Sequence, residues 1–167
     1  EARKEREERR DRRMGVHLDL AASPSTMLHT PSFLGSAAIG WGRFVRFDLV
    51  AQSTVPLTVL GGVEGVNVSV VGVRPGLAIN PRGLLSLQAD LLVGGGIVTN
   101  YLAGKADPVM VFTMTQPRVL ASVRLGDHAR LGAYASTRVA PDPEPALVQP
   151  GGHEYGVQLT LYPKRLR

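Results

Sequence analysis

The sequence predicts an all-β fold: an eight-stranded, up-and-down antiparallel β-barrel preceded by a short charged helix. Three observations predict it. Apolar residues recur at every second position from Met14 onward, which is the period of a β-strand. No segment beyond residue 14 has a comparable helical period. The seven connections alternate between long and short, so a meander of these strands has its short turns at one end and its long loops at the other.

The first thirteen residues have a different character from the rest of the chain. They hold seven basic and five acidic side chains, with opposite charges spaced four apart at Glu5 and Arg9 and at Glu8 and Arg12. This spacing supports a solvated helix, and no apolar stripe is present for it to bury. The small excess of positive charge does not favour a nucleic-acid arm. We expect residues 1–13 to be a charged linker or helix, or a segment that binds a protein partner, and residues 14–167 to form the barrel.

The alternation divides the remainder into eight expected strands and their connections. The strands are expected over residues 14–23, 34–42, 43–52, 66–79, 83–97, 108–125, 130–139 and 154–164. Short turns are expected at Gly42-Arg43, at Asn80-Pro81-Arg82 and at Gly126-Asp127-His128. The longer connections, rich in Ser, Thr, Pro and Gly, are 24–33, 53–65, 98–107 and 140–153. The alternation changes phase near Val70 and Val71, which predicts a β-bulge in the fourth strand.

Composition narrows the class of protein. The chain is 44% hydrophobic and 20% charged, and it has no cysteine, which excludes a disulfide scaffold, a cysteine-ligated zinc site and a thiol nucleophile. No run of 18 apolar residues is present, so a transmembrane helix is not expected. Beyond residue 13 long charged side chains are scarce, which is unusual for a surface that faces water. The Lys and Glu residues there are Lys105, Lys164, Glu64, Glu144 and Glu154.

Two kinds of barrel fit an alternating pattern. A soluble, lipocalin-like barrel that binds a small apolar ligand turns its apolar residues inward, whereas a membrane barrel turns them towards lipid and keeps its interior polar. Aromatic residues at the strand ends favour the membrane barrel, because such barrels place aromatic girdles at both interfaces. The soluble barrel remains the alternative. The girdle residues are Phe33, Tyr101 and Tyr155 near the long loops, and Trp41, Phe44 and Tyr162 near the short turns.

Over about residues 14 to 164 the chain resembles the small eight-stranded outer-membrane β-barrel family. The resemblance rests on strand count, loop alternation, the segment Leu-Ser-Leu-Gln-Ala-Asp-Leu-Leu that begins at Leu85, and Tyr-Gly-Val-Gln-Leu-Thr-Leu-Tyr at 155–162. It implies a place in the bacterial outer membrane, contact with the lipid bilayer, and a structural, anchoring or loop-displaying role. A protein partner of residues 1–13 would then be periplasmic. Family members often end on an aromatic residue, whereas this chain continues past Tyr162.

The alternation also assigns side chains to the two faces of the barrel. The residues predicted to point outward are Val16, Leu18, Leu20, Val45, Phe47, Leu85, Leu87, Leu91, Val123, Val157, Leu159 and Leu161. The residues predicted to point inward, as a connected polar network that plugs the lumen, are His17, Asp19, Arg46, Asp48, Gln88, Asp90, Arg124, Arg138 and Gln158. Charges in a narrow interior must be paired, because an isolated buried charge costs several kcal/mol.

The search for chemistry yields no catalytic, cofactor-binding or metal-binding residues. His17 and Asp19 share one face of the first strand, and we interpret them as a hydrogen-bonded pair in the lumen rather than as a metal or acid–base pair. Some small outer-membrane barrels are lipid-modifying enzymes, and His29 with Ser32, or His153 with Glu154, offers groups of the required kind. We interpret these four as solvated loop residues. We therefore expect no enzyme activity, no cofactor and no nucleic-acid partner.

Overall fold

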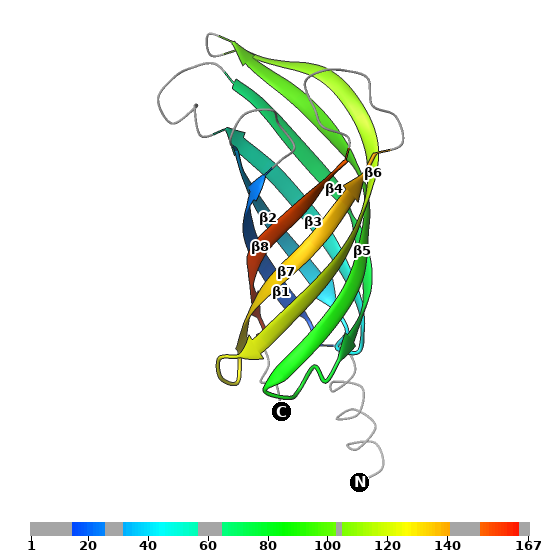
Figure 1. Ribbon diagram of the computed structural model, residues 1–167, viewed down its shortest axis with the longest axis vertical. Helices are drawn as coiled ribbons and strands as arrows, with labels where there is room; N and C mark the ends of the chain where they lie inside the picture. Colours follow the sequence, from blue (N-terminus) through cyan, green and yellow to red (C-terminus); the bar gives the residue numbers. More distant parts are fainter. Residues whose placement is uncertain (1–14, 26–31, 57–64, 103–104, 141–150, 164–167) are drawn as a thin grey trace.

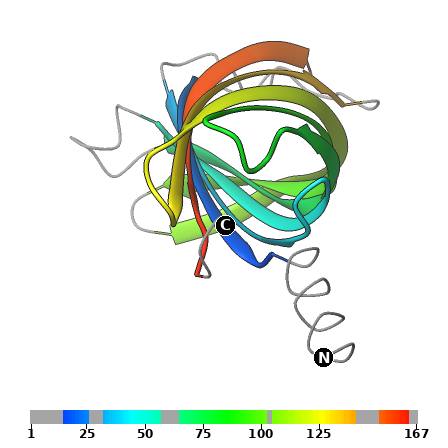
Figure 2. The same ribbon diagram turned by 90° about the horizontal axis from the view of Figure 1, so that it is seen from below.

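The computed structural model describes residues 15–25, 32–56, 65–102, 105–140 and 151–163, and they form a closed barrel (Figure 1). Each strand pairs antiparallel with the next in sequence, and the first pairs with the last, so the ring is complete when viewed from below (Figure 2). The predicted topology is confirmed. The strands are β1 (His17–Ser25), β2 (Ser32–Trp41), β3 (Val45–Pro56), β4 (Gly65–Ile79), β5 (Leu85–Leu102), β6 (Lys105–Arg124), β7 (Ala129–Val139) and β8 (Gly151–Leu161).

The predicted charged helix over residues 1–13 lies outside the described residues. Among the described residues, no helix has the length and hydropathy to cross a membrane.

The three short turns lie where the sequence predicts them. Gly42 and Gly126 have φ angles of 92° and 130°, in the region that favours glycine. Asn80 has a φ of 53°, and its side-chain amide donates to the backbone oxygen of Leu85 at 2.9 Å. The turns therefore join β2 to β3, β4 to β5 and β6 to β7 at one end of the barrel. We call this end the short-turn end and the opposite one the long-loop end.

The outer surface of the strands is apolar, as the alternation predicts. Ten of the twelve side chains predicted to point outward are exposed, and Leu159 and Leu161 on the same face are half-buried. Aromatic residues flank this surface. Phe33 and Tyr155 are exposed towards the long loops, and Trp41 and Phe44 are exposed at the short turns. Tyr162 departs from the prediction: it is buried, with its ring centroid 5.9 Å from that of His17. The side chain of Tyr101 lies outside the described residues.

The predicted β-bulge near Val70 and Val71 is wrong. The register of β4 runs without interruption through both positions, against β3 and against β5. The change of phase has another cause: Val68 and Val70 point inward into an apolar cluster, whereas Val71 and Val73 point outward. The pattern therefore records an exchange of the apolar face, with the geometry of the strand unchanged. Within the described residues, the pairing of β5 with β6 has a register shift, between Val98 and Thr99.

The strands differ in length, and the barrel wall is correspondingly uneven. β5 has 18 residues and β6 has 20, whereas β7 and β8 have 11 each. Figure 1 shows β5 and β6 rising above the upper ends of β7 and β8. A tilted strand needs only about 9–11 residues to cross the hydrocarbon of a bilayer, so β5 and β6 exceed that requirement.

Candidate functional site in the barrel interior

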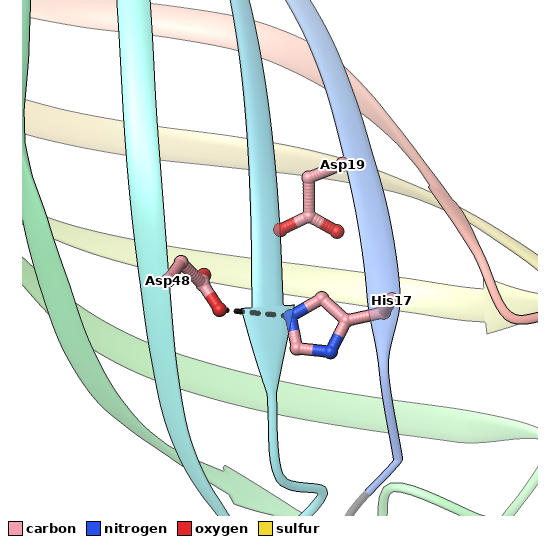
Figure 3. A group of neighbouring side chains, drawn as sticks. All are labelled: His17, Asp19 and Asp48. Atoms are coloured by element: carbon pink, nitrogen blue, oxygen red, sulfur yellow. Dashed lines mark hydrogen bonds and ion pairs between the residues drawn. The ribbon is translucent and has the colours of Figure 1, made fainter.

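The polar interior begins near the short-turn end, where one register row brings β1, β2 and β3 together. His17 pairs with Gly40, and Gly40 pairs with Asp48. Nε2 of His17 lies 2.8 Å from Oδ1 of Asp48, and both side chains are fully buried (Figure 3). Glycine is required between them, because a Cβ at Gly40 would lie 2.0 Å from Oδ1 of Asp48 and 2.4 Å from Nε2 of His17.

Two arginines bind the carboxylates of Asp19 and Asp48. Arg74 places Nη2 at 2.6 Å from Oδ2 of Asp19 and at 2.7 Å from Oδ2 of Asp48, so it bridges β1 and β3 from its position on β4. Arg46 adds a bond of 2.9 Å to Oδ2 of Asp19. All four side chains are buried. Charged pairs of this kind are stronger than neutral hydrogen bonds and fix the geometry of both partners.

A second ion pair extends the network around the barrel wall. Arg118 on β6 donates to Asp90 on β5 twice, from Nε to Oδ1 at 2.9 Å and from Nη2 to Oδ2 at 2.7 Å. Gln88 links this pair to the first group, since it accepts from Arg46 at 2.6 Å and donates to Asp90 at 2.7 Å. Arg118 also donates to Gln158 on β8. The network is therefore continuous from β1 round to β8.

The arrangement of His17, Asp19 and Asp48 invites comparison with a metal site. Each offers a ligand atom within 4.8 Å of the others. However, Arg46 and Arg74 already bind Oδ2 of Asp19, and Arg74 also binds Oδ2 of Asp48. The three carboxylates of Asp19, Asp48 and Asp90 are also matched by the guanidinium groups of Arg46, Arg74 and Arg118. A divalent ion would stand beside positive charge, so the donor set fits an ion-pair cluster and not a metal.

A separate polar cluster surrounds Glu154 on the β7–β8–β1 side of the interior. Its Oε1 accepts from the hydroxyls of Ser23 at 2.7 Å and Tyr134 at 3.1 Å. Its Oε2 accepts from Arg138 at 2.8 Å and from Gln116 at 3.1 Å. Four donors on β1, β6 and β7 thus converge on one buried carboxylate. The guanidinium of Arg118 lies 5.3 Å from the ring centre of Tyr134. This cation–π contact joins the Glu154 cluster to the ion-pair network.

Two arginines at the short-turn end donate to the backbone of a turn. Arg130 donates to the backbone oxygens of Pro81 and Gly83 at 3.1 Å and 3.0 Å, and Arg124 donates to that of Arg82 at 3.3 Å. Burial and the nearby charge of Arg82 lower the pKa of Arg43 in the β2–β3 turn. Arg124 and Arg130 therefore hold the β4–β5 turn against the end of the barrel.

An apolar cluster fills the interior of β2 to β6 on the long-loop side of the ion pairs. Its members are all buried, and Val66, Met110 and Ala140 pack against it. The cluster consists of Leu34, Ala38, Val50, Val68, Val70, Leu92, Val98, Phe112 and Met114.

Eight of the nine side chains predicted to point inward are buried, as expected. Several of their ion-pair and hydrogen-bond partners differ from the prediction. Arg124 is half-buried at the short-turn end and bonds to a turn carbonyl, so it is not part of the network. Arg138 pairs with Glu154 and not with an aspartate, and the partner of His17 is Asp48 and not Asp19. Two residues of the network escaped the sequence analysis. Arg74 follows the change of phase in β4, and Arg118 follows Pro117, which obscures the alternation in β6.

Of the residues considered for enzyme chemistry, the three that the structure describes do not assemble into a site. His29 lies outside the described residues. Ser32 is buried in β2 and donates to the backbone oxygen of Ser25 at 3.2 Å. His153 and Glu154 are consecutive residues of β8, so their side chains lie on opposite faces of the barrel wall. Glu154 points inward to its four donors, while His153 is exposed beside Thr137 at 3.1 Å. The interpretation of Ser32 and Glu154 as solvated loop residues is wrong, because both are buried.

Comparison with known proteins places the fold. No protein-family model and no curated protein sequence matches the chain. Among solved structures, Neisserial surface protein A matches with a TM-score of 0.70 at 11% sequence identity, over 89% of this chain and 96% of that one. The likeness confirms, at the level of the fold, the predicted resemblance to small eight-stranded outer-membrane β-barrels.

Proposed function

We propose that this protein is a bacterial outer-membrane β-barrel that anchors and displays its long loops, and that its lumen is closed to solutes. The observation that supports it best is the outer surface. Exposed Leu, Val, Ile and Phe side chains cover the strands on every side, while the charged strand side chains whose burial the structure describes are buried or, at Arg124, half-buried. Such a surface is stable against lipid and would drive aggregation in water.

Two features support a closed lumen. An eight-stranded barrel is only wide enough for its own side chains to fill. Here the ion pairs and the Glu154 cluster occupy one part of the interior, and the apolar cluster occupies another. A steady flow of ions would need these contacts to separate, at the cost of buried, unpaired charges.

Planar bilayers test the closed lumen directly. The wild-type barrel is expected to show no steady conductance, because no water column crosses the paired charges. The double variant Arg74→Ser, Arg118→Ser removes two guanidinium groups from the lumen and is expected to conduct. Arg124→Ser, which alters an arginine that braces a turn, is the matched control and should stay silent. A large, steady wild-type conductance would refute the closed lumen.

The soluble, lipocalin-like alternative predicts the opposite behaviour in water and in detergent. A ligand-binding barrel in water should remain monomeric without detergent and should lose its structure readily in SDS. A membrane barrel should partition into detergent and change its mobility on SDS gels only after heating. Wild-type protein that stays in the aqueous phase would overturn the membrane assignment.

A role for the charged segment 1–13 belongs to the same proposal. This segment precedes β1, which begins at the short-turn end, and short turns face the periplasm in outer-membrane barrels. Its closely spaced opposite charges suit a protein partner of mixed charge. A barrel that lacks residues 1–13 should fold and heat-shift like the full chain, but lose periplasmic cross-links that the full chain forms. Identical cross-links in both would exclude this role.

A further inference from the structure

The outer face of the barrel changes character at one level. From the short-turn end upward, the outward-facing side chains of the described strands are at first aliphatic, aromatic, glycine or proline. Uncharged polar side chains then appear on six neighbouring strands. We call them the polar collar: Ser53, Asn67, Ser69, Thr99, Thr113, Thr115, Thr137 and His153.

The strand length below the collar matches the thickness of hydrocarbon. On β4 ten residues, from Val70 to Ile79, lie between Ser69 and the short turn. A membrane-spanning strand needs about 9–11 residues at its usual tilt. β4 has 15 residues in all and β6 has 20. The upper ends of both strands therefore exceed what one bilayer can cover.

Behind the collar residues of β4 and β6 the interior is apolar, whereas behind those of β7 and β8 it holds the Glu154 cluster. Val68 and Val70 of β4 point inward and are buried, and their neighbour Ser69 points outward and is exposed. On β6, Phe112 and Met114 are buried on either side of exposed Thr113. Around Ser69 and Thr113 the wall therefore has apolar side chains inside and polar ones outside, as in a barrel in water, while Ile97 and Val111 are exposed apolar residues of β5 and β6. Below the collar the same strands have the reverse arrangement.

The collar side chains bond to one another and keep polar atoms on the outer surface. Nδ2 of Asn67 donates to Oγ of Ser53 at 3.0 Å, and Oγ of Ser69 donates to Oδ1 of Asn67 at 2.8 Å. Oγ1 of Thr137 lies 3.1 Å from Nδ1 of His153. Each hydroxyl has further lone pairs, and a polar group that cannot complete its bonds is costly in hydrocarbon. A layer that offers hydrogen bonds is the surrounding these residues fit.

We propose that the polar collar lies in the lipid headgroup layer of the leaflet on the long-loop side, and that the upper ends of β4, β5 and β6 stand in water beyond it. This inference rests on the proposed function as a membrane barrel. It fixes where the bilayer ends on the wall, and it assigns the members of the apolar cluster behind the collar, such as Val68 and Phe112, to the level at which the bilayer ends. The bilayer headgroups are the partner of the collar.

Single cysteines test the level of the bilayer, because the chain has no cysteine of its own. The folded protein is placed in phospholipid nanodiscs, which leave both ends accessible, and is exposed to a charged maleimide. Each collar position is matched with an outward position of the same strand below the collar. The pairs are Ser69→Cys with Val73→Cys, Thr113→Cys with Val119→Cys, and Thr137→Cys with Ala133→Cys. All six face outward, so the interior packing is unchanged.

Collar cysteines should react about tenfold or more faster than their partners below, because hydrocarbon excludes a charged reagent. Val68→Cys, which points inward at the collar level, should be protected as well. If the collar cysteines are as protected as those below, the bilayer extends higher and the inference is wrong, while the proposed function stands. If all six react equally fast, the barrel has no lipid belt, and the proposed function fails with it.

Discussion

The interior of β1 to β6 is filled by two kinds of contact: ion pairs in its lower part and apolar packing in its upper part. Near the short-turn end, His17, Asp48 and Arg74 are held by bonds of 2.7 to 2.9 Å. Towards the long loops, Val68 and Leu92 are buried with no polar partner. The outer face changes in the reverse sense, from aliphatic to polar. At Val68 the inner and outer chemistries are therefore opposite, since Asn67 and Ser69 face outward, whereas at Leu92 the outward neighbours Leu91 and Val93 are aliphatic as well.

This difference shows what specifies each region. Ion pairs depend on geometry, so the loss of one partner leaves a buried charge uncompensated. Apolar packing is less directional, so the loss of one side chain costs its transfer energy and the cavity that it leaves. Substitutions in the two regions should therefore differ in size and in the kind of residue that is tolerated.

The largest effect is expected from Arg74→Ala. It removes the guanidinium that contacts both Asp19 and Asp48, and breaking a buried pair in this way costs about 3 to 5 kcal/mol of unfolding free energy. Urea unfolding in lipid, followed by the fluorescence of Trp41 or by the heat-dependent shift on SDS gels, measures it. Arg124→Ala, which loses one bond to a turn carbonyl, should cost far less. Equal losses for the two arginines would show that the ion pairs do not define the lower region.

Leu92→Ala tests the upper region. Leu92 belongs to the apolar cluster and is 2% exposed, so the truncation should cost about 2 to 4 kcal/mol. Leu92→Met conserves the volume and should cost less than about 1.5 kcal/mol. Leu87→Ala, on the lipid-facing side of the same strand, is the matched control, since no cavity forms there. A loss at Leu87 as large as that at Leu92 would argue that the cluster is not a packed core.

The sequence was sufficient to predict most of the fold, because a closed meander follows from alternation and from the positions of the turns. The inward placement of Asp19, Asp48 and Asp90 followed from the same alternation. The ion-pair partners of these aspartates did not follow from the alternation. Alternation predicts which face of the wall a residue lies on, but not its height along the barrel axis. Register decides which residues meet, and it sets His17 beside Asp48 rather than beside Asp19, two residues along its own strand.

The β-bulge predicted near Val70 and Val71 was wrong because alternation alone does not fix the pairing of a strand. A change of phase in a strand has two physical origins, an inserted residue or an exchange of the apolar face, and sequence alone does not separate them. In β4 the unbroken register against both neighbours shows the exchange. The valines at 68 and 70 then belong to a core, and those at 71 and 73 to the outer surface.

Gly40→Ala sharpens the description of the lower region. The added methyl group would overlap the His17–Asp48 hydrogen bond, so one of the two side chains must move, at about 1 to 3 kcal/mol for overpacking. Gly35→Ala in the same strand meets no atom within 4 Å and should be close to neutral. Unfolding in urea compares the two. A Gly40 variant as stable as the Gly35 variant would mean that the row of His17, Gly40 and Asp48 can relax without losing its contact.

The smallest effect is expected at the seam where the barrel closes. Backbone pairing between β1 and β8 runs from Leu18 and Leu161 to Ala22 and Val157, and Ser23 continues it by donating to Glu154 at 2.7 Å. Ser23→Ala leaves Glu154 with its bonds from Tyr134, Arg138 and Gln116, so the carboxylate stays paired. Because three donors remain, the loss should be that of one ordinary hydrogen bond, about 0.5 to 1.5 kcal/mol.

Ser69→Ala on the outer face is the matched control for the seam. Ser69 is exposed and bonds to Asn67, so its loss should be within about 0.5 kcal/mol of neutral. Hydrogen exchange of the β1 and β8 amides gives a readout that global stability does not. Faster exchange confined to the seam in Ser23→Ala would show that a side chain closes the barrel above the last backbone pair. Unchanged exchange would assign that closure to the packing of Gly156 against Ala22, where an added Cβ would lie 2.6 Å from the backbone oxygen.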